Sequence, residues 1–180
     1  MSIKPEFYIN EITIPSDVSI TKQEHLIITK GSFGSVQKDF TKMPATIDFQ
    51  DEKIIIKSQG NRKKDFALVN TLQSVINNMI KGSSKGFTYK LKIVFAHFPI
   101  TVKIKGREVS VENFFGERSA RTSKIVGIDT KVTVQGEDIL VTGPNIENVS
   151  QTAANLELAT RIKNKDSRVF LDGVYIYSKE

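Results

Sequence analysis

The stretch K-G-S-S-K-G-F-T-Y-K-L-K-I-V-F-A-H-F-P-I-T-V-K-I-K-G-R, residues 81–107, is strongly basic and lies near the middle of the chain. It holds seven lysines and arginines, and no acidic residue occurs between Asp65 and Glu108. A long uncompensated positive run favours an anionic partner such as nucleic acid. The alternative is a strand whose lysines only keep it solvated. Four aromatic residues are interspersed among the charges: Phe87, Tyr89, Phe95 and Phe98.

The first six residues of this stretch mark a boundary in the chain. The segment K-G-S-S-K-G (81–86) is rich in glycine and serine, which favours a turn or a short linker. The residues that follow it predict a long strand, which opens the second half of the chain. We therefore place a domain boundary between residues 84 and 85.

The first half of the chain begins with residues typical of β-hairpins. Alternating apolar residues over 7–28 indicate strands, with T-K-Q-E-H (21–25) as a hairpin loop. Residues 45–57 indicate a second hairpin. Its turn comprises Gln50, Asp51 and Glu52.

A helix follows these strands in the first half. Apolar residues recur at helical spacing, and the spacing predicts a helix from Asp65 to Lys81. Asp65 is expected to act as the N-cap, because a short carboxylate accepts hydrogen bonds from the first free amides. Gly82 is expected to end the helix.

The second half repeats this order of elements. A shift of 82 residues places the apolar pair at positions 100 and 102 over the pair at 18 and 20. A shift of 85 residues places T-K-V-T-V-Q-G-E-D-I-L-V-T (130–142) over the hairpin at 45–57. A second helix is predicted over 146–162. Two matches in the same order indicate an internal duplication.

The duplication predicts an α+β fold of two tandem domains, residues 1–84 and 85–180. Each domain is expected to be a small antiparallel-rich β-sheet with one packed α-helix. The chain closes with R-V-F-L-D-G-V-Y-I-Y (168–177), which predicts two short apolar runs around an Asp-Gly turn.

Composition limits the classes to which the protein can belong. Lysine and arginine total 26 against 20 acidic residues, so the formal net charge is +6, which is compatible with a nucleic-acid partner. The absence of cysteine excludes disulfides, thiol nucleophiles and thiolate metal sites. No segment has the apolar length of a signal peptide or membrane span. We therefore expect a soluble cytoplasmic protein with no membrane partner.

Motifs of catalysis are missing from the sequence. His25 and His97 lack an evident carboxylate partner or metal-ligand spacing. The acidic pair Glu137-Asp138 is better explained by a hairpin turn, and no phosphate loop, dinucleotide fingerprint or nucleophile elbow occurs. G-S-F-G (31–34) has the form of a KH-type RNA clamp, but its flanks predict strands rather than helices. We expect a protein that is not an enzyme, without catalytic residues, metal or cofactor.

Two further groups of cations fall on predicted loops and element ends of the second half. Cations on loops reach phosphates, and no basic helix suited to a DNA groove is predicted, so we expect contacts with RNA rather than DNA. Residues 161–165 can also interact with the dipole at a helix end, and a cation just past that end is still free to contact a partner. The groups are Arg118, Arg121 and Lys124, and Arg161, Lys163, Lys165 and Arg168.

Four segments carry a recognisable pattern: N-M-I-K-G-S-S-K-G-F-T-Y-K-L-K-I-V-F-A-H-F-P-I (78–100), V-E-N-F-F-G-E-R (111–118), T-R-I-K-N-K-D (160–166) and R-V-F-L-D-G-V-Y (168–175). They resemble the large-subunit ribosomal protein L6 family in its archaeal and eukaryotic form. The resemblance extends over nearly the whole chain and is strongest from residue 61 onward. It implies two domains related by duplication, in agreement with the repeat.

The resemblance also implies a function. It implies a structural constituent of the large ribosomal subunit that binds 23S-type rRNA near the stalk base and the sarcin–ricin loop, close to where translational GTPases dock. The second domain would make most of the RNA contact, and large-subunit proteins near the stalk base would be neighbours. The rival interpretation is an enzyme or regulatory adaptor on the same scaffold, against which the missing catalytic motifs count.

The candidate rRNA-binding residues are chosen on two grounds, their match to the family motifs and their charge. Most match the family motifs, whereas Lys92, Arg121 and Lys124 are included for their charge alone. The full set is Lys81, Lys85, Lys90, Lys92, Arg118, Arg121, Lys124, Arg161, Lys163, Lys165 and Arg168.

Overall fold

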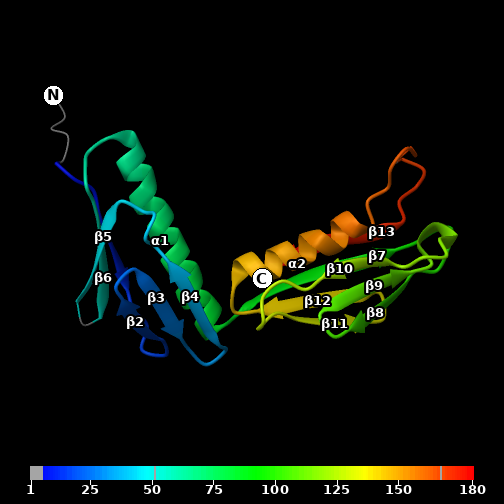
Figure 1. Cartoon of the computed structure of the whole chain (residues 1–180), viewed down its shortest axis with the longest axis horizontal. Coiled ribbons are helices and arrows are strands. Elements are labelled where there is room, and N and C mark those ends of the chain that lie inside the picture. The colour runs from blue at the N-terminus through cyan, green and yellow to red at the C-terminus, as the bar shows by residue number, and fades with distance from the viewer. Residues whose placement is uncertain (1–5, 51, 167) are drawn as a thin grey trace. The chain divides into compact units, whose positions relative to one another are not determined.

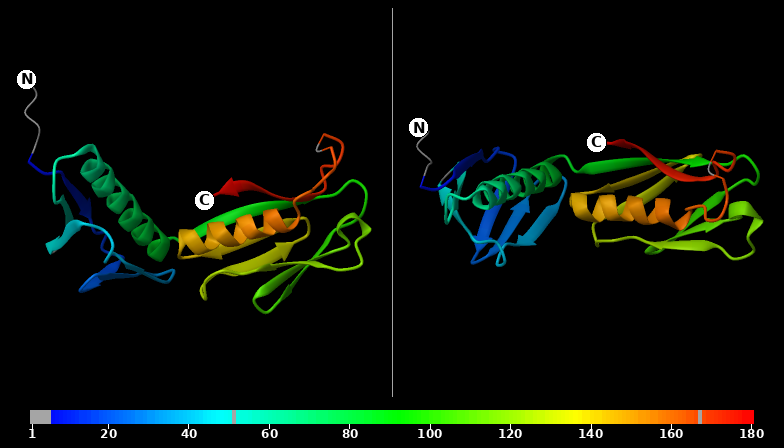
Figure 2. Two further views of the ribbon diagram at one scale, coloured as in Figure 1. Left: turned by 45° about the horizontal axis from the view of Figure 1, so that its top comes forward. Right: turned by 90° about the horizontal axis from the view of Figure 1, so that it is seen from above.

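The structure is a computed structural model that describes residues 6–50, 52–166 and 168–180. The chain divides between Lys85 and Gly86 into two compact units (Figure 1). Each unit has its own hydrophobic core. We call the part up to Lys85 the first unit and the part from Gly86 the second unit. Each unit combines short antiparallel strands with one α-helix, so the predicted α+β class is confirmed (Figure 2).

The first unit contains two three-stranded antiparallel sheets. Helix α1 (Lys63–Ser84) packs against both of them, and its apolar face supplies Leu72 and Ile76 to the core. One sheet has the order β1 (Ile9–Thr13), β6 (Lys53–Ser58), β5 (Ala45–Gln50). The other has the order β2 (Ser19–Gln23), β3 (Leu26–Lys30), β4 (Ser35–Asp39).

The second unit repeats this plan and adds one strand. Helix α2 (Ile146–Ala159) packs against strands of both sheets, and a short 3-10 turn, η1 (Phe114–Gly116), precedes the last strand of the smaller sheet. The larger sheet has the order β11 (Lys131–Gln135), β12 (Asp138–Gly143), β7 (Phe87–Val94), β13 (Gly173–Lys179). The smaller has the order β10 (Arg121–Lys124), β9 (Glu108–Glu112), β8 (Thr101–Lys105).

Each unit therefore has two sheets, whereas the sequence predicts one. The alternating pattern over 7–28 suggests a single layer, but the chain turns after β1, where Val18 donates its backbone N–H to the carbonyl of Pro15 at 3.2 Å. The next hairpin is also tighter than predicted, since Gln23 pairs with Leu26 and the loop is only two residues long. The strands of the 45–57 hairpin are confirmed, although Asp51 lies outside the described residues.

Helix α1 extends beyond both predicted ends. Asp65 lies inside the helix, where its carboxylate accepts the backbone N–H of Arg62 at 3.0 Å, so it caps the helix from within the first turn. Gly82 is buried within the helix, which continues to Ser84. The interpretation of residues 81–86 as a linker is therefore wrong for all but the last two positions.

The loop G-S-F-G (31–34) explains why Gly82 does not stop the helix. It joins β3 to β4, and the backbone N–H groups of Phe33 and Gly34 donate to the carbonyl of Ser83 at 2.9 and 3.3 Å. A Cβ on Gly31 would lie 2.5 Å from that oxygen, so only glycine permits the approach. Because loop amides satisfy a carbonyl that a helix end normally leaves unpaired, the helix needs no glycine stop.

The C-terminal segment also differs from its prediction. Helix α2 ends at Ala159 rather than near residue 162. The predicted Asp-Gly turn is wrong, because Gly173 already belongs to β13 and Asp172 is buried, with its Oδ1 accepting the backbone N–H groups of Ala96 and His97 at 2.8 and 3.1 Å. The described residues 160–166 and 168–172 belong to neither a helix nor a strand, and β13 follows them at an edge of the larger sheet.

Candidate nucleic-acid interface

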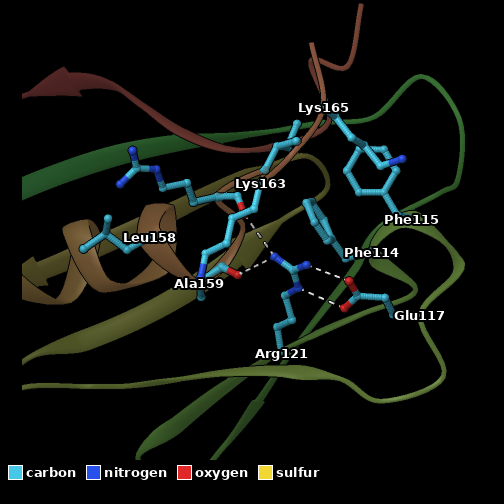
Figure 3. Close-up of a pocket in the computed structure, with 10 residues that line it drawn as sticks. Phe114, Phe115, Glu117, Arg121, Leu158, Ala159, Lys163 and Lys165 are labelled. Atoms are coloured by element: carbon cyan, nitrogen blue, oxygen red, sulfur yellow. Dashed lines mark hydrogen bonds and ion pairs between the residues drawn. The ribbon is translucent and has the colours of Figure 1, made fainter. Parts of the chain in front are cut away.

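The end of α2, strand β10 and the η1 turn enclose a hollow of about 360 Å³ in the second unit, which we call the first hollow (Figure 3). It brings together residues from both groups of loop cations that the sequence predicts. The lining residues are Phe114, Phe115, Glu117, Arg121, Leu158, Ala159, Arg161, Ile162, Lys163 and Lys165.

Arg121 holds the floor of the first hollow. Its Nε and one Nη donate to the Glu117 carboxylate at 2.9 and 2.6 Å, and its other Nη donates to the carbonyls of Ala159 and Arg161 at 3.1 and 3.3 Å (Figure 3). The ring of Phe114 lies 4.2 Å from the guanidinium carbon. These contacts occupy most of the guanidinium donors, so they favour a structural role for Arg121 over direct contact with a partner.

A tight turn places Glu117 against Arg121. Asn113, Phe115 and Gly116 have φ values of 61°, 53° and 71°, in the left-handed region. Asn113 stabilises the turn by donating its side-chain amide to the carbonyl of Pro99 at 3.0 Å. The hydrogen bond from Arg121 lowers the pKa of Glu117, so this carboxylate stays ionised at neutral pH and fixes the guanidinium.

Three cations follow the end of α2 and project around the first hollow. Arg161 and Lys163 are exposed, and within the described part of the chain their side chains form no hydrogen bond or ion pair. The ammonium of Lys165 lies 4.8 Å from the ring centroid of Phe170 and 5.8 Å from that of Phe115, in cation–π contact. Their positive charge is therefore not neutralised by any described carboxylate.

A contact between the exposed His97 and the buried Asp172 anchors the loop that carries these cations. His97 Nδ1 lies 2.8 Å from Asp172 Oδ2, and the His97 ring stacks on Phe170 with centroids 5.1 Å apart. Burial raises the pKa of Asp172, but hydrogen bonds from Ala96 and His97 outweigh burial and bring the pKa below its ordinary value. The sequence shows no partner for His97 because that partner lies 75 residues away.

A second hollow of about 560 Å³ adjoins the first and shares four residues with it. Two of the four residues that line only the second hollow are aromatic, Phe170 and Tyr175, and neither is among the site residues predicted from the sequence. Phe170 and Tyr175 do fall in the R-V-F-L-D-G-V-Y motif, which was the available signal. The lining residues are Glu157, Leu158, Thr160, Arg161, Ile162, Lys165, Phe170 and Tyr175.

The predicted lysines of strand β7 are paired within the protein. Lys90 Nζ lies 2.5 Å from Glu180, and Lys92 Nζ lies 3.3 Å from Glu137 and 3.5 Å from Asp138. Asp138 is directly opposite Lys92 in the register of β12 and β7. These partners raise the pKa of both lysines, in each case chiefly through a side-chain hydrogen bond. The inference of an uncompensated positive field along residues 81–107 is therefore wrong for this strand.

The remaining predicted cations lie apart from the two hollows. Lys81 is in the last turns of α1 and Lys85 is its C-cap, so both belong to the first unit. Arg118, Lys124 and Arg168 are exposed in the second unit. Within the described ranges, no ion pair joins the side chains of these last three residues to a carboxylate.

The described residues contain neither a metal-binding cluster nor a membrane-spanning helix. No three acidic or histidine side chains there lie close enough together to hold a metal ion. None of the helices in the same ranges combines the length and apolar character needed to cross a bilayer.

The sequence is similar to those of known ribosomal proteins. The family model of ribosomal protein L6 matches residues 98–173, which include every residue that lines the first hollow and all but Tyr175 of those that line the second. The chain is 48% identical to the large ribosomal subunit protein uL6 of Methanosphaera stadtmanae, over 93% of this chain and 91% of that protein. It is 48% identical to uL6 of Staphylothermus marinus, over 96% and 95%, and 39% identical to uL6 of Aeropyrum pernix, over 96% and 94%. The chain belongs to the ribosomal protein L6 family.

Proposed function

We propose that this protein is a structural, non-enzymatic constituent of the large ribosomal subunit whose second unit binds rRNA through the cations around the first hollow. Its relatives are named as large-subunit proteins. The observation that carries the RNA-binding assignment is the position of Arg161, Lys163 and Lys165. They project from one loop, and no described carboxylate pairs with them.

The geometry favours contact with the phosphate backbone of folded RNA. Arginine and lysine on a loop approach phosphates from several directions, and the irregular grooves of folded RNA present phosphates in such arrangements. Arg121 and Glu117 hold the end of α2 in place, and the pair of His97 and Asp172 anchors the other end of the loop. A loop held at both ends loses little conformational entropy when it binds.

The place on the ribosome is the finer part of the proposal. The family resemblance supports a site near the stalk base and the sarcin–ricin loop, beside the docking region of translational GTPases. Neighbouring large-subunit proteins near the stalk base would then be protein partners, and the cytoplasmic ribosome would be the location. DNA is not proposed as a partner.

A salt titration tests the binding mode. The protein is mixed with a transcript of archaeal large-subunit rRNA, and the association constant is measured across a series of potassium concentrations. About five phosphate contacts predict a log–log slope of roughly −3 to −4. A slope near zero, or no binding at all, would contradict the proposed function.

Chemical footprinting tests the proposed location. Large-subunit rRNA is probed with and without the protein in a reconstituted particle. Protection that clusters at the sarcin–ricin loop and stalk base is expected. Protection confined to other regions would leave the RNA-binding proposal intact but would contradict its location.

A further inference from the structure

The second hollow combines exposed apolar side chains with cations. Leu158 is 59% exposed and Tyr175 is 40% exposed, and both line it beside Arg161 and Lys165. Phosphate contact alone leaves the apolar side chains uncovered. Covering apolar surface releases water and stabilises a complex, so the ligand that fits this hollow has an apolar face as well as a negative charge.

Tyr175 offers a flat face because of its neighbour in the strand. Gly173 precedes it by two residues in β13, so the two residues lie on the same side of the sheet. A Cβ on Gly173 would lie 3.2 Å from three atoms of the Tyr175 side chain, which shows that the ring lies back over the glycine. Burial, aided by Asp172 and Glu157, raises the pKa of Tyr175, so its hydroxyl stays neutral at physiological pH.

Two cations line the second hollow, and neighbouring groups hold the backbone of one and the ammonium of the other. Arg161 follows the last turn of α2, where its backbone carbonyl is held by Arg121. The ammonium of Lys165 rests 4.8 Å from the ring centroid of Phe170. One acidic residue, Glu157, is among the lining residues. Proteins bind unpaired nucleotides with aromatic rings, on which the bases stack, placed next to cations that contact the nucleic-acid backbone.

We propose that the second hollow binds one unstacked nucleotide of the rRNA. Its base lies against Tyr175 and Leu158, and its phosphate contacts Arg161 and Lys165. The volume of about 560 Å³ is within the range of sites that enclose a small ligand. This inference rests on the proposed function, since it assumes that the second unit contacts rRNA.

The test compares two tyrosines of the same strand. Tyr175→Leu removes the aromatic face from the second hollow, and Tyr177→Leu is the matched control, because Tyr177 is 56% exposed in β13 and does not line the hollow. Tyr175→Phe keeps the ring and removes only the hydroxyl. Affinity for the large-subunit rRNA transcript is measured for each variant over a salt series, together with the thermal midpoint of unfolding.

Base stacking on an aromatic side chain predicts a loss of affinity of about five- to a hundredfold for Tyr175→Leu. Tyr175→Phe and Tyr177→Leu should each stay within about twofold of the wild type. The log–log slope should be unchanged in all three, because stacking releases no counterions. If Tyr175→Leu does not fold, Leu158→Ser, at a largely exposed position, should lower the affinity with the same unchanged slope.

The outcomes separate the two proposals. If the wild type binds with a steep salt slope but Tyr175→Leu or, where it was needed, Leu158→Ser matches Tyr177→Leu, the nucleotide site is wrong and the proposed function stands. If Tyr175→Leu binds the transcript normally but fails to enter reconstituted large subunits, the second hollow takes a protein segment, which also overturns the inference. A wild type that does not bind rRNA would refute the proposed function itself.

Discussion

Two groups of cations in the second unit look alike in the sequence and differ in the structure. Lys90 and Lys92 of β7 belong to a stretch without acidic residues, yet each lies within 3.5 Å of a carboxylate. Arg161, Lys163 and Lys165 follow α2 with Asp166 beside them in the sequence. No ion pair joins these three to a carboxylate of the described chain.

The difference follows from what surrounds each group. A strand inside a sheet has neighbours on both sides, and the register between β12 and β7 places Asp138 opposite Lys92. The loop after α2 has no paired strand to supply such partners. Charge density along a sequence therefore overestimates the free charge of a central strand, and a loop retains the charge that its sequence shows.

The largest expected effect is a difference in rRNA affinity between the two units when each is produced as a separate fragment. A fragment of residues 86–180 should fold alone, because its core is its own, and should keep most of the rRNA affinity. The fragment 1–85, which contains Lys81 and Lys85, should bind at least about a hundredfold more weakly, as expected for about three lost contacts. Filter binding and circular dichroism measure both properties. Equal affinity of the two fragments would contradict the assignment.

The next effect tests whether Arg121 supports the loop cations or contacts RNA itself. Arg121→Met should lower the free energy of unfolding by about 2 kcal/mol, because it removes a bidentate ion pair and two hydrogen bonds to the end of α2. The rRNA affinity should fall while the salt slope stays constant. Lys124→Met, an exposed position on the same strand, is the control for stability. A slope that becomes less steep would make Arg121 a phosphate ligand.

A smaller effect depends on pH through Asp172. Because its pKa is lowered in the folded state, the stability it contributes is complete above about pH 4 and is lost as the pH falls through the folded value. Asp172→Asn should lower stability at pH 7 by about 1–2 kcal/mol and reduce the drop between pH 5 and pH 2. Thermal melts measure both, with the exposed Asp129→Asn as the control. An unchanged acid profile would show that the pair with His97 is not important for stability.

The smallest effect concerns a paired strand lysine. Lys92→Met should change the rRNA affinity by less than about 0.5 kcal/mol, because its charge is already opposed by Glu137 and Asp138. The measurement is the same salt series. A fivefold loss of affinity together with a less steep slope would mean that the β7 face meets RNA directly.

Much of the fold could be predicted from the sequence, and the misses have physical reasons. The hairpin at 130–142 and the apolar face of α2 follow from local periodicity. The end of α1 could not be predicted, because the amides that satisfy Ser83 come from a loop fifty residues earlier. The role of Asp172 depends on amides 75 and 76 residues away.

The candidate site could be derived only in part from the sequence, for the same reason. Cation positions are visible in a sequence, so Arg161, Lys163 and Lys165 could be named. The hydrogen-bond partners of a cation are not visible in a sequence. Arg121 therefore cannot be distinguished from Lys163 until the structure shows that Arg121 donates to Glu117 and to the end of α2. The aromatic wall of the second hollow forms only when β13 packs beside β7, next to the end of α2.

We propose that rRNA binding depends on the unpaired loop cations rather than on the paired strand cations. Two triple variants with the same change in net charge test it directly. One is Arg161→Met/Lys163→Met/Lys165→Met, and the other is Lys90→Met/Lys92→Met/Lys103→Met, in which each lysine forms an ion pair in the wild type. Methionine keeps much of the aliphatic packing of the replaced side chains. Affinity for the rRNA transcript is measured across a salt series, with the thermal midpoint recorded for each protein.

The loop triple should lose about 3 kcal/mol of binding free energy, at about 1 kcal/mol for each phosphate contact. Its log–log slope should become less steep by about 2, and its midpoint should stay close to that of the wild type. The strand triple should keep its slope and lose less than about 1 kcal/mol. A greater loss of affinity in the strand triple, at an unchanged midpoint, would contradict the role of the loop cations, because the face of β7 and β8 would then be the RNA-binding surface.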